Sequence, residues 1–169
     1  QGEIHFDDVR VPAANMVIGK EFYGFTVEQV LALANAFMGS TFSGVGRAAY
    51  EMALDYAKTR VQGGRPIIEL PAVRARLLRM FARVEAAQSL SRRVQVLAAT
   101  VGPRVEHSIA SKVFCTETAF QVASDALQIF GGNGLSREYP IEKILRDARA
   151  AMIEDGCNEM LSIVGGARL

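Results

Sequence analysis

Two adjacent carboxylates near the C-terminal end of the chain, Glu154 and Asp155, are followed directly by Gly156 and Cys157. A carboxylate can act as a general base when an apolar pocket favours its protonated form and brings its pKa towards the working pH. It can also be structural, because an aspartate that precedes Gly-Cys-Asn is a good helix N-cap. The local sequence favours the N-cap interpretation of Asp155, and proton transfer is the alternative.

Arginines beside glycines could bind a phosphate-bearing ligand. Arg60 and Arg65 flank the glycine-rich stretch 61–64, and guanidinium groups pair well with phosphate, although solvated loop arginines are commoner. The stretch 131–134, Gly-Gly-Asn-Gly, is typical of a helix end and turn. Glycines there would also let the backbone approach a cofactor closely.

The remaining reactive residues indicate packing rather than chemistry. Neither His5 nor His107 has a glutamate three residues before it, so the di-iron pattern of helical bundles is not predicted. Two histidines far apart also make a weak case for zinc or for a nucleophile–histidine pair, and no metal site is predicted. We expect Cys115 to pack inside a helix, and Arg146 and Asp147 to form an ion pair.

The composition describes an ordinary globular chain of one domain. Of its 169 residues, 50% are hydrophobic and 22% are charged, with a formal net charge of +1. This balance does not indicate a nucleic acid or an anionic membrane as a partner. No apolar run approaches the roughly 18 residues of a membrane span, and two cysteines do not make a disulfide framework. The chain begins with Gln1, so we expect a piece of a longer protein whose compartment its sequence does not report.

Hydrophobic periodicity predicts an α-helical bundle with one strand in front of it. Residues 1–12 alternate between apolar and polar side chains, which is typical of a strand with one solvated face. After Gly24 the apolar residues recur with the helical period. Helices are predicted at about 26–58, 71–97, 103–130 (with Pro103 in its first turn), 141–152 and 157–166. The fold class predicted is an all-α, up-and-down helical bundle.

Five segments follow one another in an order that is more specific than any one of them. They are GEIHFDDVRVP at 2–12, the alanine-spaced stretch Gly44–Arg60, DALQIFGGNG at 125–134, REYPIEK at 137–143 and RDA at 146–148. In this order they resemble the C-terminal part of the acyl-CoA dehydrogenases, flavoproteins that oxidise acyl-CoA thioesters. The resemblance covers essentially all of the chain, and the stretch 128–148 is highly specific.

The resemblance implies a place in a larger enzyme. Residues 1–22 would be the end of the family's middle β domain and a linker, and residues 23–169 the C-terminal helical bundle. The implied enzyme is an oxidoreductase of fatty acid metabolism that uses FAD, an acyl-CoA substrate, and electron-transfer flavoprotein or another acceptor. It would be a homodimer or homotetramer, in the bacterial cytoplasm or the mitochondrial matrix. The 169 residues alone are expected to be inactive, because most of the flavin site would belong to other domains.

The resemblance also implies roles for individual residues. The counterpart of Arg60 reaches the FAD pyrophosphate of a neighbouring subunit. The counterparts of Gln128 and Gly132 approach the ADP half of the same flavin. Cys157 and Glu159 occupy positions near FAD.

Counting from Arg-Asp-Ala at 146–148 places Asp155 at the position of the family's catalytic base, which is usually a glutamate. Asp155 would be the base, and adjacent Glu154 would point away from it. The alternative base position of some members falls on Ala34, with Asn35 next to it. An aspartate is one methylene shorter than a glutamate, so its oxygens retreat by roughly 1.5 Å. Two alternatives therefore stay open: a flavin oxidase similar to nitroalkane oxidase, which uses an aspartate base, and an inactive assembly subunit.

Overall fold

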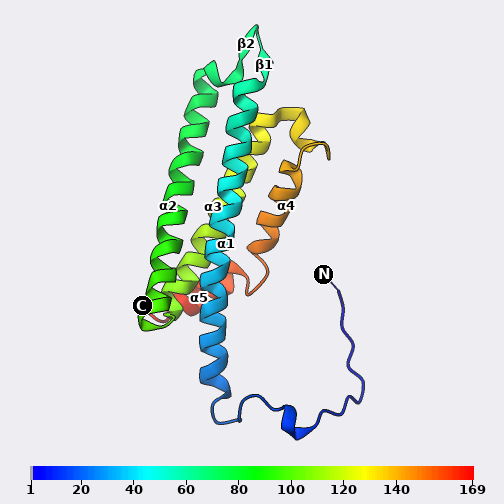
Figure 1. The fold of residues 1–169 in the computed structure, drawn as a ribbon, viewed down its shortest axis with the longest axis vertical. Coiled ribbons are helices and arrows are strands. Elements are labelled where there is room, and N and C mark those ends of the chain that lie inside the picture. Colours follow the sequence, from blue (N-terminus) through cyan, green and yellow to red (C-terminus); the bar gives the residue numbers. More distant parts are fainter. Residues whose placement is uncertain (1) are drawn as a thin grey trace.

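The computed structural model describes residues 2–169, and its helices form the predicted bundle (Figure 1). Within this range there are five α-helices: α1 (Tyr23–Thr59), α2 (Pro71–Val101), α3 (Val105–Phe130), α4 (Ile141–Ala151) and α5 (Asn158–Gly166). Three of them are long and lie side by side, α4 packs along them, and α5 crosses the base of the bundle. The all-α fold class is confirmed, and each helix lies where the periodicity predicts it.

The glycine-rich break after α1 is a tight hairpin that the sequence analysis did not predict. Strand β1 (Val61–Gln62) pairs antiparallel with β2 (Arg65–Pro66). Gly63 and Gly64 form the two-residue turn with φ of 61° and 81°, which side chains other than glycine rarely adopt. Short 3₁₀ helices complete the connections, at Ala13–Asn15, Ile67–Glu69 and Gly131–Leu135.

The N-terminal segment differs from the strand predicted for residues 1–12. Residues 2–12 contain no strand, and every side chain in this range is exposed. A strand with one solvated face needs a neighbouring strand to pair with, and residues 13–169 offer this segment none. Residue 1 lies outside the described range. The alternation of apolar and polar residues therefore has no counterpart in the secondary structure of this chain.

Small residues set the spacing between α1 and α3. Alanines fill the core where the two helices meet, and a Cβ placed on Gly46 would lie 3.3 Å from the Cα of Ala119. At the far end of the same pair, the Tyr56 ring stacks on Phe130 with a centroid distance of 4.2 Å. Tyr139, just before α4, meets the Phe130 ring edge-on at 5.3 Å. These aromatic contacts fix the end of α3 and the start of α4 against α1.

Surface ion pairs on α4 follow the helical spacing. Arg146 pairs with Glu142 at 2.9 Å, and Lys143 pairs with Asp147. The predicted ion pair between Arg146 and Asp147 is therefore wrong, because neighbouring residues on a helix do not face each other. Similarly, α3 begins at Val105 rather than Pro103, after the extended Arg104. Across residues 2–169, no helix is long and apolar enough to cross a membrane.

Candidate functional site

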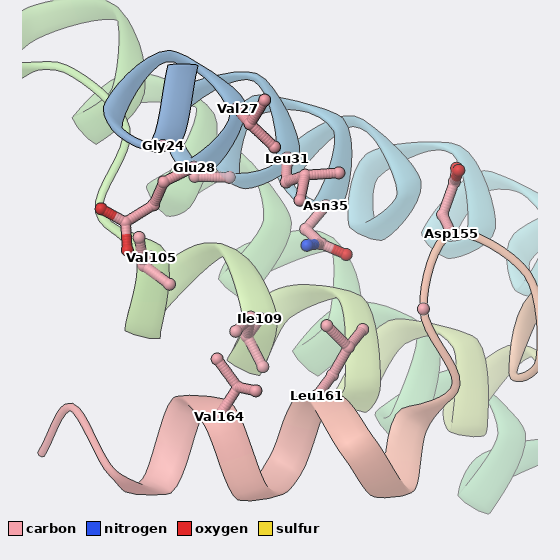
Figure 2. Close-up of a pocket in the computed structure, with 12 residues that line it drawn as sticks. Gly24, Val27, Glu28, Leu31, Asn35, Val105, Ile109, Asp155, Leu161 and Val164 are labelled. Carbon is pink, nitrogen blue, oxygen red and sulfur yellow. The ribbon is translucent and has the colours of Figure 1, made fainter. Parts of the chain in front are cut away.

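A cavity of about 600 Å³ lies between the first half of α1, the start of α3, α5 and the loop that joins α4 to α5 (Figure 2). Most of its wall is aliphatic. The lining residues are Gly24, Val27, Glu28, Leu31, Ala32, Asn35, Val105, Ile109, Asp155, Gly156, Leu161 and Val164. In Figure 2 the carboxylate of Glu28 lies at one end of the cavity and Asp155 at the other. Glu28 forms an ion pair with Arg168, so its charge is matched.

Asp155 lies in the loop between α4 and α5 with a left-handed backbone. Its φ is 51°, and that of Gly156 is 90°. The N-cap of α5 is Cys157, without a side-chain hydrogen bond, and the Asp155 side chain is exposed to the cavity mouth. The N-cap interpretation of Asp155 is therefore wrong, because the left-handed turn separates its carboxylate from the first-turn amides. Glu154 is exposed and does not line the cavity.

Lys112 anchors this loop to α3, and the sequence analysis did not identify this residue. Lys112 on α3 is fully buried, and its Nζ donates to the carbonyl oxygen of Gly156 and to Oδ1 of Asn158, both at 2.8 Å. Burial lowers the pKa of Lys112, while nearby carboxylates, Asp155 foremost, act against this shift. Its spacing could have indicated that Lys112 is buried, because it lies three residues after Ile109 and therefore on the apolar face of the helix.

Asn158 connects this lysine to a second buried polar group. Its Nδ2 donates to Oγ1 of Thr116 at 3.1 Å, and Thr116 in turn donates to the Lys112 carbonyl oxygen at 2.9 Å. Asn158 and Thr116 are both buried. The first turn of α5 is therefore tied to the middle of α3 by hydrogen bonds that water does not reach.

Asn35 adds an amide to the apolar wall of the cavity. It is 4% exposed, and its Oδ1 has no hydrogen-bond partner within residues 2–169. Figure 2 shows its side chain between Leu31 and Asp155, directed towards the cavity. A buried amide oxygen without a partner costs about 1–3 kcal/mol in lost hydration. The sequence analysis did not predict that Asn35 lines this cavity, although it named Asn35 beside Ala34.

A second, polar pocket of about 310 Å³ brings together Arg60, Gln128 and Gly132. Arg60 caps the end of α1 and is exposed, and within residues 2–169 it forms no ion pair. Asn133 donates from Nδ2 to the hydroxyl of Tyr56 at 3.0 Å and forms part of the same wall. A Cβ on Gly132 would meet nothing within 4 Å, so its backbone is open to approach.

Cys157 and Glu159 do not join that polar pocket. They follow Asp155 at the C-terminal end of α4, whereas Gly132 precedes the N-terminal end of this helix. The 11 residues of α4 span roughly 16 Å. Cys157 is half-buried and Glu159 is exposed, and neither lines the Asp155 cavity. The predicted site residues therefore form two groups, one at each end of α4.

Cys115 packs in the core, as predicted. It is fully buried, its thiol lies 3.5 Å from the carbonyl oxygen of Ala87, and burial raises its pKa to about 11. Within residues 2–169 no group of three histidine, cysteine, aspartate or glutamate side chains could hold a metal ion.

The fold and these two groups define a helical domain in which Asp155 and the ion-paired Glu28 line a largely aliphatic cavity, and an arginine–glutamine–glycine cluster lines a polar one. Residues 24–169 match the family model of the acyl-CoA dehydrogenase C-terminal domain. The chain therefore belongs to the acyl-CoA dehydrogenase family.

Known relatives agree with this assignment. The chain is 37% identical over 167 residues to an acyl-CoA dehydrogenase of Bacillus subtilis, covering 96% of this chain and 43% of the relative. The structure of butyryl-CoA dehydrogenase from Megasphaera elsdenii superposes with a TM-score of 0.89 at 33% identity, over 96% of this chain and 43% of that one. A structure described as an electron transferring flavoprotein of Acidaminococcus fermentans gives a TM-score of 0.92 at 29% identity, over the same shares. The chain thus spans less than half the length of these relatives.

Proposed function

We propose that the chain is the C-terminal domain of an FAD-dependent acyl-CoA dehydrogenase in which Asp155 removes the α-proton of an acyl-CoA thioester. One observation carries the proposal: Asp155 presents a carboxylate at the wall of a largely aliphatic cavity. Asp155 lies in a left-handed turn with a φ of 51°, and in this proposal the turn makes up for the shorter side chain of the aspartate. In this proposal, residues 1–22 are the end of the middle β domain and the linker to this bundle.

In this reaction the domain's own residues would have two roles, proton removal and the exclusion of water. Asp155 takes a proton from the α-carbon, and the aliphatic wall formed by residues such as Leu31 and Ile109 excludes water from the acyl group. A bound FAD would supply the acceptor for the hydride that leaves the β-carbon when the double bond forms. The cavity shape and the position of Asp155 decide which α-proton lies within reach.

The two groups of residues at the ends of α4 fit a shared FAD. Arg60 supplies an unpaired positive charge, Gln128 an exposed amide and Gly132 an open backbone, which suit the pyrophosphate and ADP half of a flavin. Cys157 and Glu159 would lie beside the FAD of the catalytic end. The two groups lie at opposite ends of α4, and in this proposal each FAD is shared, with its ADP half held by the first group of one subunit and its flavin end beside the second group of another, so the enzyme would be a homodimer or homotetramer.

The electron acceptor of the complete enzyme would be electron-transfer flavoprotein or a similar carrier. This acceptor is what membership of the acyl-CoA dehydrogenase family implies. An enzyme of this kind would work in the bacterial cytoplasm or the mitochondrial matrix.

The test is anaerobic flavin bleaching by a panel of straight, branched and cyclic acyl-CoAs, with the complete polypeptide that carries this domain. Asp155→Asn should slow bleaching by about 10²–10⁴-fold, the usual contribution of a general base, while FAD stays bound. Glu154→Gln is the matched control and should bleach at the wild-type rate. An Asp155→Asn enzyme as fast as wild type contradicts the proposal. The 169-residue chain alone should show no flavin absorbance.

A flavin oxidase related to nitroalkane oxidase is the second candidate, favoured by the aspartate where the family usually has glutamate. Peroxide production from nitroalkanes, without bleaching by any acyl-CoA, would select it. An inactive assembly subunit is the third candidate, because the alternative base position holds Ala34. Purification of the complete polypeptide without flavin would support that role.

A further inference from the structure

The buried lysine of α3 has no role in the proton transfer described above, although it touches the loop that carries Asp155. Lys112 is fully buried, and its ammonium group spends two of its three hydrogens on Gly156 and Asn158, the residues on either side of Cys157. Buried lysines are rare in proteins unless they are paired. Here the partners are the carbonyl oxygen of Gly156, in the loop after Asp155, and the side-chain amide oxygen of Asn158, at the start of α5.

We propose that Lys112 is the positioning residue that holds the Asp155–Gly156 turn in place and so fixes the carboxylate at the cavity wall. This inference rests on the proposed role of Asp155 as the proton acceptor. Lys112 does not line the cavity, and its hydrogen bonds go to Gly156 and Asn158 rather than to the Asp155 carboxylate, so it acts through the loop rather than on the substrate.

The turn at Asp155 has a strained backbone. Asp155 has a φ of 51°, where residues other than glycine are uncommon, and such a conformation persists only when its surroundings enforce it. Backbone hydrogen bonds close the loop at its two ends, from Glu154 to the carbonyl oxygen of Ala150 and from Asn158 to that of Met152. Residues 153–156 are all exposed, and none of these backbone bonds involves Asp155 or Gly156. The bond from Lys112 to the Gly156 carbonyl oxygen acts on the residue next to Asp155. It is therefore placed to enforce this conformation.

Removal of the Lys112 ammonium group would break some hydrogen bonds of this region and leave others in place. Gly156 would lose its partner for the carbonyl oxygen, and Asn158 would lose one of the groups that hold its side chain. Asn158 would still be bonded to Thr116, so α5 keeps its attachment to α3. The turn is then expected to relax more than the helix. A displacement of about 1 Å at a reacting group can cost on the order of 100-fold in rate.

The charge of Lys112 also acts on the acidic groups around it. The acidic groups that act on Lys112 are Asp155, Cys157 and Glu154 in the loop and Glu159 on α5. On the α1 side of the cavity, Glu28 is the charged residue of the lining, and it pairs with Arg168. The protonated Lys112 on α3 places a positive charge beside the acidic groups of the loop. Its removal leaves the acidic groups of the loop without a buried positive charge beside them, and we expect the acid limb of the pH–rate profile to move to higher pH.

The experiment uses the complete polypeptide with FAD bound and follows flavin reduction by the best acyl-CoA of the panel. Lys112→Met preserves the length of the side chain but removes the charge and the donors. We expect the reduction rate at saturating substrate to fall by about 100-fold, with a much smaller change in KM. The acid limb of the pH–rate profile should also move to higher pH. Lys143→Met, which removes an exposed lysine on α4, is the matched control and should leave both unchanged.

A rescue experiment separates positioning from general loss of structure. Lys112→Ala leaves space for the missing methylenes and the amine, so added n-propylamine should restore part of the rate. The neutral n-propanol should not. If Lys112→Met fails to fold, Asn158→Ala, which removes one acceptor of the same ammonium, should show a smaller loss of rate that amine does not restore.

Three outcomes overturn the inference. They are a Lys112→Met rate close to wild type, an unchanged pH profile despite a slower rate, and equal rescue by amine and alcohol. The Asp155→Asn variant is measured beside them. If that variant is also fully active, the proposed function has failed. If it is inactive while Lys112→Met is unaffected, only the positioning role of Lys112 has failed.

Discussion

Gly39 of α1 lies directly against Ser111 of α3, so closely that a Cβ on Gly39 would be 2.3 Å from Oγ of Ser111 and 3.0 Å from its carbonyl carbon. No side chain fits at this distance without a shift of one helix. The contact sets the alignment of α1 and α3 next to the site. One residue beyond Ser111 is Lys112, and one turn before Gly39 is Asn35. The helix contact therefore places both the loop anchor and the cavity amide.

Gly39→Ala tests this contact. We expect the free energy of unfolding of the chain to fall by about 1–3 kcal/mol in urea titrations, because overpacking forces the helices apart. Gly44→Ala is the control on the same helix, where a Cβ would meet nothing within 4 Å. It should raise the stability by up to about 1 kcal/mol through helix propensity alone. A Gly39→Ala chain as stable as Gly44→Ala would contradict the close packing.

Gly156→Ala addresses the turn beside the carboxylate. Gly156 has a φ of 90°, and a Cβ there would lie 3.1 Å from Cδ2 of Leu161. Both effects oppose alanine, and the strain should cost about 1–3 kcal/mol in unfolding free energy. In the complete polypeptide, flavin reduction should slow while FAD stays bound, because the neighbouring Asp155 is displaced. Gly166→Ala, at the end of α5 with open space and no positive φ, should leave the reduction rate unchanged and should not lower the unfolding free energy.

The sequence predicts the fold well because stripes of the helical period determine which faces are buried. It predicts the position of Asp155 through spacing from the Arg-Asp-Ala segment, but not its conformation. A left-handed aspartate depends on Gly156 and on Lys112, which is 43 residues away in the chain. A lysine also indicates a surface position on average, so its burial becomes evident only when α5 and its Asn158 are packed against α3.

Asn35→Leu tests the amide in the cavity wall. Its Oδ1 is buried without a partner, and leucine has a similar size and no polar atom to desolvate. We expect the unfolding free energy to rise by about 1 kcal/mol. Asn133→Leu is the control, because Asn133 donates to the hydroxyl of Tyr56 and should lose stability instead. Marked destabilisation by Asn35→Leu would indicate that the amide does have a hydrogen-bond partner.

Arg60→Ala tests the polar pocket. If the guanidinium binds the FAD pyrophosphate, its removal should weaken FAD binding to the complete polypeptide by about 10–150-fold, which corresponds to about 1.5–3 kcal/mol for a charged hydrogen bond. Equilibrium titration of the apoprotein measures this. Arg65→Ala, on strand β2 and outside the pocket, should bind FAD as wild type does. Equal effects of the two substitutions would indicate a general charge effect.

Cys115 should make the stability of the domain depend on alkaline pH. Burial raises the pKa of its thiol to about 11 from an ordinary value of 9.0. Between these two pH values the unfolded chain loses the thiol proton while the folded chain keeps it, so the unfolded state is favoured as the pH rises. The stability should fall by about 2–3 kcal/mol across this interval, since each tenfold change in proton affinity is worth 1.36 kcal/mol.

The measurement for Cys115 is urea unfolding under reducing conditions at several pH values from about 8 to about 11, for the wild-type chain and for Cys115→Ala. The difference between the two curves isolates the thiol, because Lys112 and the other lysines titrate in both chains. The wild-type curve should decline relative to the variant above pH 9.0, the ordinary pKa of the thiol. Parallel curves would mean that the Cys115 thiol ionises as readily in the folded core as in the unfolded chain, and hence that water reaches it between α3 and Ala87.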